Sequence, residues 1–205
     1  MIGIIDYGMG NLSSVKNILD FLEIENVIIE DPKYVPSMKG LIIPGVGSFQ
    51  RAMQNLTEKG FVTPIQNFAN LGKPILGICL GMQLLANIGT EPEECLGLGL
   101  IPGRVELMKP ENLRIPHMGW NGIKIVNEHP IFEEVKTSAD FYFVHSFAFV
   151  VENVNNLLSV TEYGNDFPSI VANDSRNVIG IQFHPEKSQK QGTKILENFS
   201  KLVNA

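Results

Sequence analysis

The feature that most constrains this chain is a cysteine, Cys79, placed where an apolar run meets an amphipathic segment. Residues 75–78 predict a buried strand, and residues 80–86 predict the helix that follows it. Gly77 and Gly81 stand two positions before and two positions after the cysteine, the spacing of a nucleophile elbow with sulfur in place of oxygen. A strand that turns at once into a helix crowds the residues beside the turn, so we expect that only glycine fits there.

Such a turn favours a reactive thiol. A sulfur at the start of a helix lies beside free N–H groups and the positive end of the helix dipole, which favour thiolate over thiol. The N–H of Leu80 is left free to stabilise a negatively charged oxygen that develops during a reaction. The alternative is an unreactive core cysteine between two packing glycines, and the motif alone does not separate the two.

Composition and charge limit the classes of protein to consider. The chain has 205 residues, 44% hydrophobic and 19% charged, as expected of a globular protein, and we expect residues 1–205 to form one domain. The net charge of −6 and the pI of about 5.2, with scattered basic residues, argue against nucleic acid or anionic membrane as a partner.

The sequence also gives an expected location. No apolar run approaches the roughly 18 residues of a membrane helix, and Met1 leads directly into an apolar segment without a basic stretch, so neither a membrane span nor a signal peptide is expected. Cys79 and Cys95 are the only cysteines, which excludes a disulfide framework. A reducing cytoplasm is therefore the expected location.

Strand and helix patterns predict the fold class. In the first half, apolar strands alternate with amphipathic helices, which predicts βαβ units and a parallel sheet. The strands are expected at 2–6, 27–30, 41–43 and 75–78, and the helices near 12–22, 48–56 and 65–70. In the second half, turns replace several helices, so antiparallel strands are expected to extend the parallel core into a mixed sheet. These strands are expected at 104–108, 123–126, 141–151, 157–161 and 178–183, before a last helix at about 192–203.

Two glycine-containing loops follow strand ends in the first half. Residues 7–11 lack both the G-x-G-x-x-G pattern and the Walker lysine, so we interpret them as a structural turn. Residues 44–47 follow a strand at the end where open α/β sheets bind ligands. Their two glycines allow a backbone amide to turn toward a ligand, and the N–H of Val46 is a candidate second donor to an oxyanion.

A histidine and a carboxylate follow the last predicted strand. His184 and Glu186, two residues apart, are suited to be a general base and the group that orients it. The order nucleophile, histidine, acid differs from the Ser…Asp/Glu…His order of α/β-hydrolases. His117, His129 and His145 compete for the role of base, but none has a carboxylate at short spacing after a strand end. No Cys/His cluster has ligand spacing, so no metal site is expected.

The only tryptophan, Trp120, lies in the segment 116–121, which we interpret as a loop. We expect its indole to pack against the core, with a partner surface as the alternative.

Two blocks carry a resemblance to a known family. Gly77-Ile-Cys-Leu-Gly-Met-Gln83 together with Gln182-Phe-His-Pro-Glu186 resembles the class I, or triad, glutamine amidotransferases. Further blocks resemble, within that class, the glutaminase subunits of imidazole glycerol phosphate synthase, at 5–12, 97–103, 116–121, 144–146, 162–164 and 184–188. The resemblance implies a three-layer fold with helices on both faces of a mixed, mostly parallel central sheet.

The resemblance also implies an activity and a partner. The protein would hydrolyse L-glutamine to L-glutamate and ammonia for histidine biosynthesis. A (β/α)8 cyclase subunit would use the ammonia to make imidazole glycerol phosphate. Cys79 would be the nucleophile, His184 the general base and acid, and Glu186 the orienting carboxylate. No cofactor is implied.

Other residues have implied roles in binding. The N–H groups of Val46 and Leu80 would stabilise the oxyanion, and the substrate would be held by Gly47, Gln83, Ser146 and Phe147. Phe147 stands where the family tends to have tyrosine, which leaves a role for a phenol there in doubt.

Two other classes of function stay open. One is a different triad amidotransferase or a cysteine peptidase-like hydrolase, against which the 116–121 block argues. The other is a catalytically silent binding subunit, against which the intact Cys79, His184 and Glu186 argue.

Overall fold

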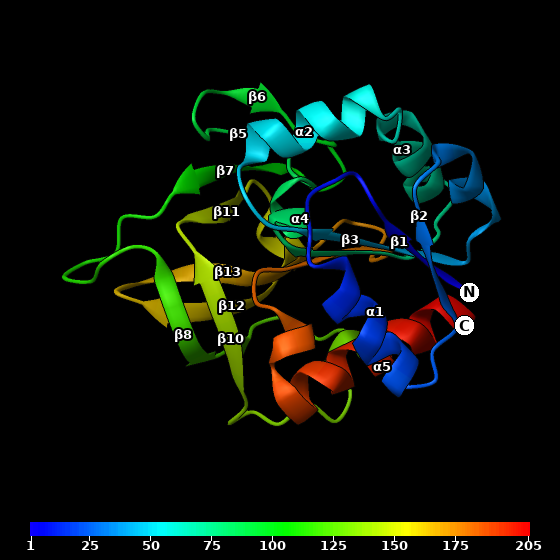
Figure 1. Ribbon diagram of the computed structural model, residues 1–205. Coiled ribbons are helices and arrows are strands. Elements are labelled where there is room, and N and C mark those ends of the chain that lie inside the picture. Colours follow the sequence, from blue (N-terminus) through cyan, green and yellow to red (C-terminus); the bar gives the residue numbers. More distant parts are fainter.

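The computed structural model describes residues 1–205, and its centre is an eight-stranded sheet (Figure 1). The strands of this sheet are β1 Ile2–Ile5, β2 Asn26–Ile29, β3 Gly40–Gly45, β4 Ile75–Cys79, β9 Lys124–Ile125, β12 Leu157–Tyr163, β13 Asn165–Ala172 and β14 Val178–Ile181. Their order in space is β2-β1-β3-β4-β14-β13-β12-β9. The pairs from β2 to β14 are parallel and those from β14 to β9 antiparallel, which confirms the predicted mixed sheet.

The central strands are buried along their whole length. Every residue of β1, β3, β4 and β14 is buried, as expected for parallel strands covered on both faces. This burial explains why these strands have continuous apolar runs instead of alternating ones.

Helices cover both faces of the sheet, as predicted (Figure 1). On one face lie α1 Leu12–Phe21 and α5 Gln189–Asn204, and on the other lie α2 Phe49–Glu58 and α3 Val62–Asn70. Each face has its own apolar core, of 27 buried residues on the α2–α3 side and 26 on the α1–α5 side, so neither layer is dispensable. None of the helices combines the length and the apolar character needed to cross a membrane.

The segment 141–151, predicted as one strand, is two strands that belong to different sheets. Asp140–His145 forms β10, which pairs with β8 (His117–Gly122) in a two-stranded sheet. Phe147–Val151 forms β11, in a four-stranded sheet with β7 Gly103–Leu107, β5 Ile88–Gly89 and β6 Cys95–Leu96. The break falls at Ser146, whose carbonyl accepts the N–H of Met108 at 2.9 Å and so turns the chain from one sheet to the other.

Four strands were not predicted, the two-residue strands β5 and β6 and the longer strands β8 and β13. The segment 116–121, interpreted as a loop, is mostly β8, because its pairing with β10 outweighs the turn-forming glycines and asparagine in it. β13 contains Pro168, which disfavours a strand assignment from sequence, yet pairs with both β12 and β14.

The helix predicted at 80–86 is shorter than expected. It spans only Leu80–Gln83, as α4, and the following residues turn away. The reason is that the carbonyls of Leu84, Leu85 and Ala86 accept N–H groups from residues 98–101 in place of the next helical turn. Four 3₁₀ helices complete the structure: η1 Pro32–Ser37, η2 Pro130–Phe132, η3 Val154–Asn156 and η4 Pro185–Lys187.

The turn after β4 is packed backbone against backbone. A Cβ atom on Gly81 would collide with the carbonyl oxygen of Ile43 in β3, and one on Gly77 would lie 2.5 Å from the carbonyl oxygen of Gly81. The predicted requirement for glycine on both sides of Cys79 is therefore steric.

We expect Gly81→Ala to lower the free energy of unfolding by about 3 kcal/mol or more, because the strand carbonyl that it meets cannot move aside. Gly122→Ala is the matched control: its Cβ would meet nothing closer than Asp140 Oδ1 at 3.7 Å, so a loss of at most about 0.5 kcal/mol is expected. Urea unfolding of both variants measures the difference. Equal losses would contradict the steric explanation.

Candidate active site

A cavity of about 380 Å³ opens beside Cys79, at the carboxyl ends of β3, β4 and β14. Open α/β sheets bind ligands at this end. The cavity brings together most of the residues predicted for the site: Val46, Gly47, Cys79, Leu80, Gln83, Ser146, Phe147 and His184. Glu186 does not line the cavity but contacts His184 from behind.

Cys79 has a strained backbone conformation. Its φ of 55° and ψ of −112° put a non-glycine residue in a region that costs on the order of 1–3 kcal/mol. The side chain is 7% exposed, and its sulfur lies 3.8 Å from Nε2 of Gln182 and 3.9 Å from the carbonyl oxygen of Val144. This backbone conformation places the sulfur at the cavity, between the end of β4 and the start of α4.

His184 and Glu186 form a buried pair. Nδ1 of His184 lies 2.8 Å from Oε1 of Glu186, and the side chains are 3% and 1% exposed. His184 is held by its backbone, because its N–H donates to the carbonyl of Tyr142 and its carbonyl accepts the hydroxyl of Ser188. Because Nδ1 is directed at the carboxylate, Nε2 is the nitrogen left for the cavity. No group of the protein forms a hydrogen bond with Nε2.

The electrostatics of His184 favour its charged form. Burial lowers the pKa of the ring, but the interactions of the ring with the nearby Cys79 sulfur and with the Glu186 carboxylate, including the negative charge on both, raise it to about 9. The imidazole therefore holds its proton at neutral pH, facing the sulfur.

Val46 and Leu80, whose N–H groups are the predicted oxyanion donors, lie on either side of Cys79, one across the sheet and one next in the chain. Gly45 pairs with Cys79 in the sheet, so Val46 follows directly beside the nucleophile, and its N–H has no backbone acceptor. Leu80 is the first residue of α4, so its N–H has no acceptor within that helix. Both residues predicted to supply oxyanion donors line the cavity.

The loop at Val46 is braced from one side. The buried hydroxyl of Tyr7 donates to the carbonyl of Pro44 at 2.8 Å. Burial, and secondarily the charge of Cys79, raise the pKa of Tyr7 far above its ordinary value, so the hydroxyl stays a donor. The residues 7–11 accordingly serve as a structural turn, in which the side chain of Asn11 also caps α1 by accepting the N–H of Ser14.

The segment predicted to hold substrate is fixed through its carbonyls. The carbonyl oxygen of Phe147 accepts hydrogen bonds from Nε2 of Gln83 at 3.0 Å and from Nδ1 of His145 at 2.8 Å. The amide nitrogen of Gln83 also donates to Oε1 of Gln182, so only the side-chain oxygen of Gln83 is left for a ligand. The Phe147 ring packs against the core on the α2–α3 side, where a phenol is not needed for packing.

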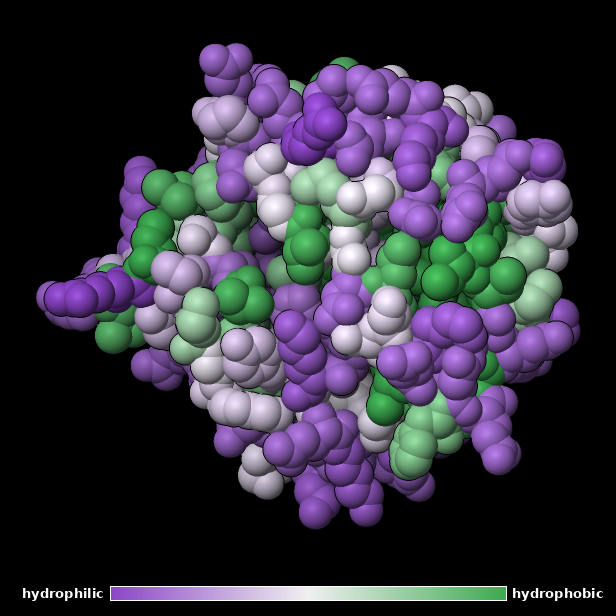
Figure 2. All heavy atoms as spheres, viewed as in Figure 1, coloured by the Kyte–Doolittle hydropathy of each residue, from purple (hydrophilic) through white to green (hydrophobic).

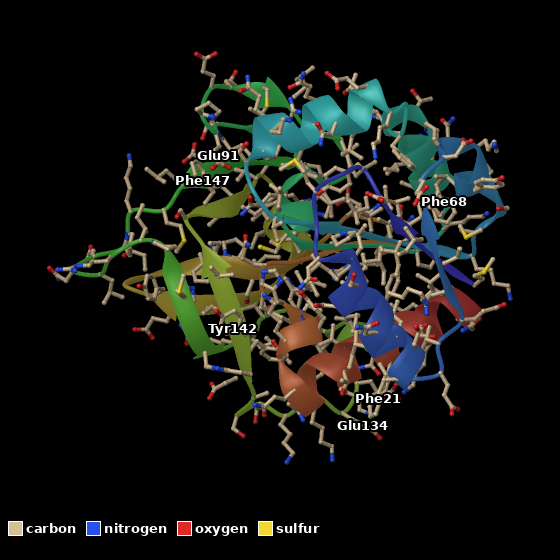
Figure 3. The ribbon with its side chains drawn as sticks, viewed as in Figure 1. Phe21, Phe68, Glu91, Glu134, Tyr142 and Phe147 are labelled. Carbon is tan, nitrogen blue, oxygen red and sulfur yellow. The ribbon has the colours of Figure 1, made fainter.

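Three residues that line the cavity were not predicted: Glu91, Val144 and His145. Glu91 is the only carboxylate among the lining residues (Figure 3 labels Glu91 and Phe147). Its Oε2 accepts the N–H of Phe49 at 3.1 Å and so caps α2, where Ser48 provides no side-chain cap. Because serine is itself a favoured N-cap residue, nothing in the sequence at Ser48 indicates that another acceptor reaches this helix.

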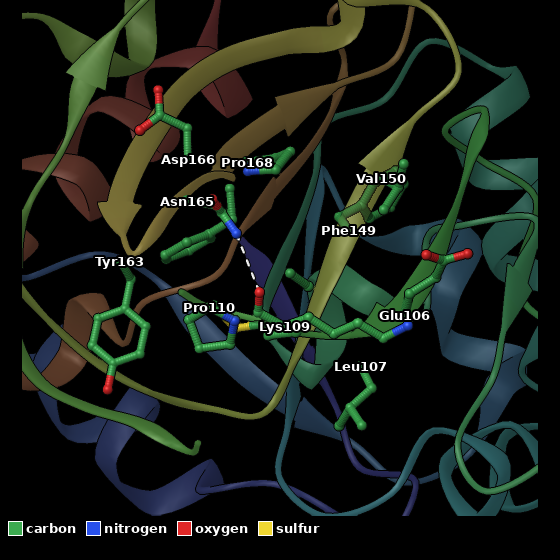
Figure 4. A pocket seen from close by; sticks show the side chains of 13 residues that line it. Glu106, Leu107, Lys109, Pro110, Phe149, Val150, Tyr163, Asn165, Asp166 and Pro168 are labelled. Atoms are coloured by element: carbon green, nitrogen blue, oxygen red, sulfur yellow. Dashed lines mark hydrogen bonds between the residues drawn. The ribbon is translucent and has the colours of Figure 1, made fainter. Parts of the chain in front are cut away.

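A second, smaller hollow of about 170 Å³ lies between β7, β11 and β13 (Figure 4). Asn165 donates there to the carbonyl of Lys109 at 3.1 Å, and aromatic rings and prolines form much of the wall. No cysteine or histidine lines this hollow, so it offers no nucleophile of the kind found at Cys79.

The expectation that Trp120 packs against the core is wrong. Its side chain, on β8, is 49% exposed and makes an edge contact with the ring of Tyr142 at 5.9 Å. Met118 on the same strand is 63% exposed, and Leu113 and Ile115 before it are also exposed. Figure 2 shows hydrophobic residues gathered beside the protruding loop between β7 and β8, next to this strand.

Comparison with known proteins agrees with this geometry. The family model for class-I glutamine amidotransferases matches residues 4–202. A crystal structure of a glutamine amidotransferase superposes with a TM-score of 0.78 at 20% identity, covering 100% of this chain and 99% of the other. A structure of PurLQS from Thermotoga maritima gives a TM-score of 0.76 at 19% identity, covering 97% and 96%. These structural similarities establish the α/β fold.

The family match and the site define the chain as a member of the class-I glutamine amidotransferases, and its sequence relatives narrow the family to the HisH subunits of imidazole glycerol phosphate synthase. The subunit from Desulfitobacterium hafniense is 48% identical over 204 residues, covering 100% of this chain and 95% of that protein. The subunit from Sulfurimonas denitrificans is 47% identical over 208 residues, covering 100% and 99%.

We expect His184 to lose its proton near pH 9 in the wild-type protein. In Cys79→Ser, burial still disfavours the charged ring while the contribution of the sulfur is gone, so the pKa of His184 falls below its wild-type value. NMR of the ring Cε1–H as a function of pH measures both values. Cys95→Ser is the control and leaves the titration unchanged. A pKa that stays near 9 in Cys79→Ser would assign the shift to Glu186 alone.

Proposed function

We propose that the protein hydrolyses L-glutamine to L-glutamate and ammonia through Cys79, His184 and Glu186, and delivers the ammonia to a cyclase subunit that makes imidazole glycerol phosphate in histidine biosynthesis. The observation that carries the proposal is the strained cysteine in a cavity that is also lined by a protonated histidine and by Val46 and Leu80, the residues with the candidate oxyanion N–H groups. Membership in the HisH family supports the substrate and the pathway.

The first half-reaction forms a thioester. The Cys79 thiolate attacks the carboxamide carbon, and the electron pair of the C=O bond moves to oxygen. The N–H groups of Leu80 and Val46 stabilise that oxyanion, each donor worth on the order of 10²–10³ in rate. When the oxyanion collapses, the C–N bond breaks, and Nε2–H of His184 supplies the proton that makes the leaving group ammonia.

The second half-reaction restores the enzyme. Neutral His184 takes a proton from water as the oxygen attacks the thioester, and a second oxyanion forms in the same place. Its collapse breaks the C–S bond, which releases glutamate and leaves Cys79 as thiolate beside protonated His184. Glu186 keeps the proton on Nδ1 throughout and stabilises the charged ring, the task of the acid in a triad.

Glutamine brings its own charges into the cavity. Its α-ammonium group requires a negative partner, and Glu91 is the carboxylate that lines the cavity. The backbone at Gly47, Ser146 and Phe147 and the side-chain oxygen of Gln83 hold the rest of the substrate. Because Glu91 is anchored to the first turn of α2, its free oxygen is oriented before substrate binds.

The partner follows from the fate of the product. Ammonia released into neutral water is largely protonated and lost as a nucleophile, so hydrolysis should proceed only when an acceptor site is attached. The cyclase docks on the face that carries Cys79, the Val46 loop and His184, with exposed Met118 and Trp120 near the contact. Rotation of the Val46 peptide, whose N–H has no backbone acceptor and which precedes Gly47 at φ 102°, makes or breaks the oxyanion hole.

The test is glutamate release by the protein alone, with a (β/α)8 cyclase, and with the cyclase and its ribonucleotide ligand. We expect the ligand-bound complex to raise kcat by about 10²-fold or more, as for one oxyanion donor supplied in the transition state. Cys79→Ser should abolish hydrolysis under every condition.

Cys95→Ser is the matched control and should retain most activity. Cys95 lies in β6, outside the cavity, and partial burial raises the pKa of its thiol. Equal losses in the two cysteine variants would refute the nucleophile assignment. No glutamate release by the wild-type complex would favour a silent binding subunit.

We expect Glu91→Gln to raise KM for glutamine about tenfold or more, the effect of losing a charge-assisted hydrogen bond. Glutamine at this position keeps an oxygen that can accept the N–H of Phe49, so α2 stays capped and the variant isolates the lost charge. Glu93→Gln, an exposed change in the same loop, is the control. Steady-state kinetics of the cyclase complex measure both, and an unchanged KM in Glu91→Gln would remove this residue from the binding site.

A further inference from the structure

Two buried histidines, His117 and His145, take no part in the steps above. Strands β8 and β10 lie side by side (Figure 1), and their antiparallel register places His117, at the start of β8, opposite His145, at the end of β10. The residues are 3% and 6% exposed, and Nδ1 of His117 lies 3.2 Å from Nε2 of His145. Buried polar rings are costly unless their nitrogens are hydrogen-bonded, so the contacts of the other two nitrogens decide what the pair can do.

The contact at one end fixes the protons of His145. Its Nδ1 lies 2.8 Å from the carbonyl oxygen of Phe147, which can only accept, so Nδ1 carries a hydrogen. Burial, with a further contribution from the charge of His184, lowers the pKa of His145 to about 4, and the ring is neutral at pH 7. Nε2 is then a bare acceptor, and His117 must donate to it from Nδ1.

The contact at the other end requires the same arrangement. Oδ1 of Asn121 accepts the N–H of Gly122, and Nδ2 donates to the carbonyl of Glu162 at 2.9 Å, which fixes the orientation of the amide. The second hydrogen of Nδ2 faces Nε2 of His117 at 3.4 Å, so that nitrogen must be bare. A proton on Nε2 of His117 would face the Asn121 amide donor, and a proton on Nε2 of His145 would face the Nδ1–H donor of His117.

The chain of hydrogen bonds continues past Phe147 to the nucleophile. The Phe147 carbonyl also accepts Nε2 of Gln83, and the same amide nitrogen donates to Oε1 of Gln182 at 3.1 Å. Nε2 of Gln182 lies 3.8 Å from the sulfur of Cys79. The Phe147 carbonyl is therefore the point at which the β8–β10 pair and the catalytic cysteine are joined.

We propose that His117 and His145, both neutral and both protonated at Nδ1, are positioning residues that hold the Phe147 carbonyl and so tie the substrate-binding segment to β8. The inference rests on the proposed glutaminase function for its kinetic consequence. In structural terms, the proposal connects the two faces of β8. The inner side of β8 holds His117, and its exposed side chains, Met118 and Trp120, lie where we place the partner.

The tautomers are tested directly by ¹⁵N NMR of the imidazole nitrogens, a measurement that does not depend on activity. We expect His117 and His145 to carry hydrogen on Nδ1 and none on Nε2 at pH 7. Resonances are assigned by their loss in His117→Asn and His145→Asn. A hydrogen on Nε2 of either ring overturns the proposal.

The kinetic test uses His117 in the complex with the cyclase. His117→Phe keeps a ring against Phe143 and Tyr163 but leaves Nε2 of His145 without a donor. We expect KM for glutamine to rise about tenfold, with kcat changing less, because His145 without its donor no longer holds the Phe147 carbonyl in place. His117→Asn, whose amide nitrogen stands in for Nδ1, should restore KM. Unchanged kinetics in His117→Phe, or no rescue, overturns the proposal.

Ser169→Ala controls for a purely structural effect. It removes another buried hydrogen bond, the 2.9 Å contact between the hydroxyls of Ser159 and Ser169, without touching the chain from Asn121 to Phe147. If it raises KM as much as His117→Phe does, the histidine effect is only structural and the proposal fails. If the wild-type complex releases no glutamate, the proposed function fails. The ¹⁵N NMR measurement still tests the predicted tautomers of His117 and His145 in that case.

Discussion

The structure depends on one close backbone contact, between the turn after β4 and the end of β3. Gly81 has no space for a side chain beside the carbonyl of Ile43, and the register of the two strands brings Gly45 opposite Cys79. This contact sets the relative positions of the sulfur, the Leu80 N–H and the Val46 peptide without using any flexible side chain. A site built on backbone in a packed core is held more rigidly than one built on surface loops.

Identical side chains have opposite properties on the two sides of the cavity. His184 faces a carboxylate and a sulfur, which keep it charged, whereas His145 faces a carbonyl and a second histidine, which keep it neutral. Both rings are almost fully buried, so burial alone does not explain the difference. The partners decide it, and they separate a ring that exchanges protons with substrate from a ring that holds its proton in place.

Local patterns in the sequence were sufficient for the parallel half of the sheet and for the core of the site. Fully buried strands give unbroken apolar runs, and the spacing around Cys79 and between His184 and Glu186 is short enough to be seen in one segment. The break at Ser146 was not predicted, because apolar residues predominate in both 141–144 and 147–151 and the turn depends on a hydrogen bond from Met108.

Other predictions were incomplete or wrong for the same reason: the structure there depends on contacts between residues far apart in the sequence. The length of α4 was overestimated because the acceptors that its next turn would use are taken by residues 98–101. Glu91 resembles any acidic residue of a polar loop, and only its approach to the first turn of α2 distinguishes it. Trp120 was assigned to the core from its residue type, whereas the pleat of β8 directs it outward.

The position of β14 has a consequence for how the chain acquires its chemistry. This strand lies between β4 and β13 at the middle of the sheet, although it comes from residues 178–181, near the end of the sequence. During synthesis, β4 stays an open edge until the last part of the chain emerges, and His184 emerges only after that strand. A growing or truncated polypeptide thus has the cysteine without its base, and a thiol of ordinary reactivity is all that it can expose to the cell.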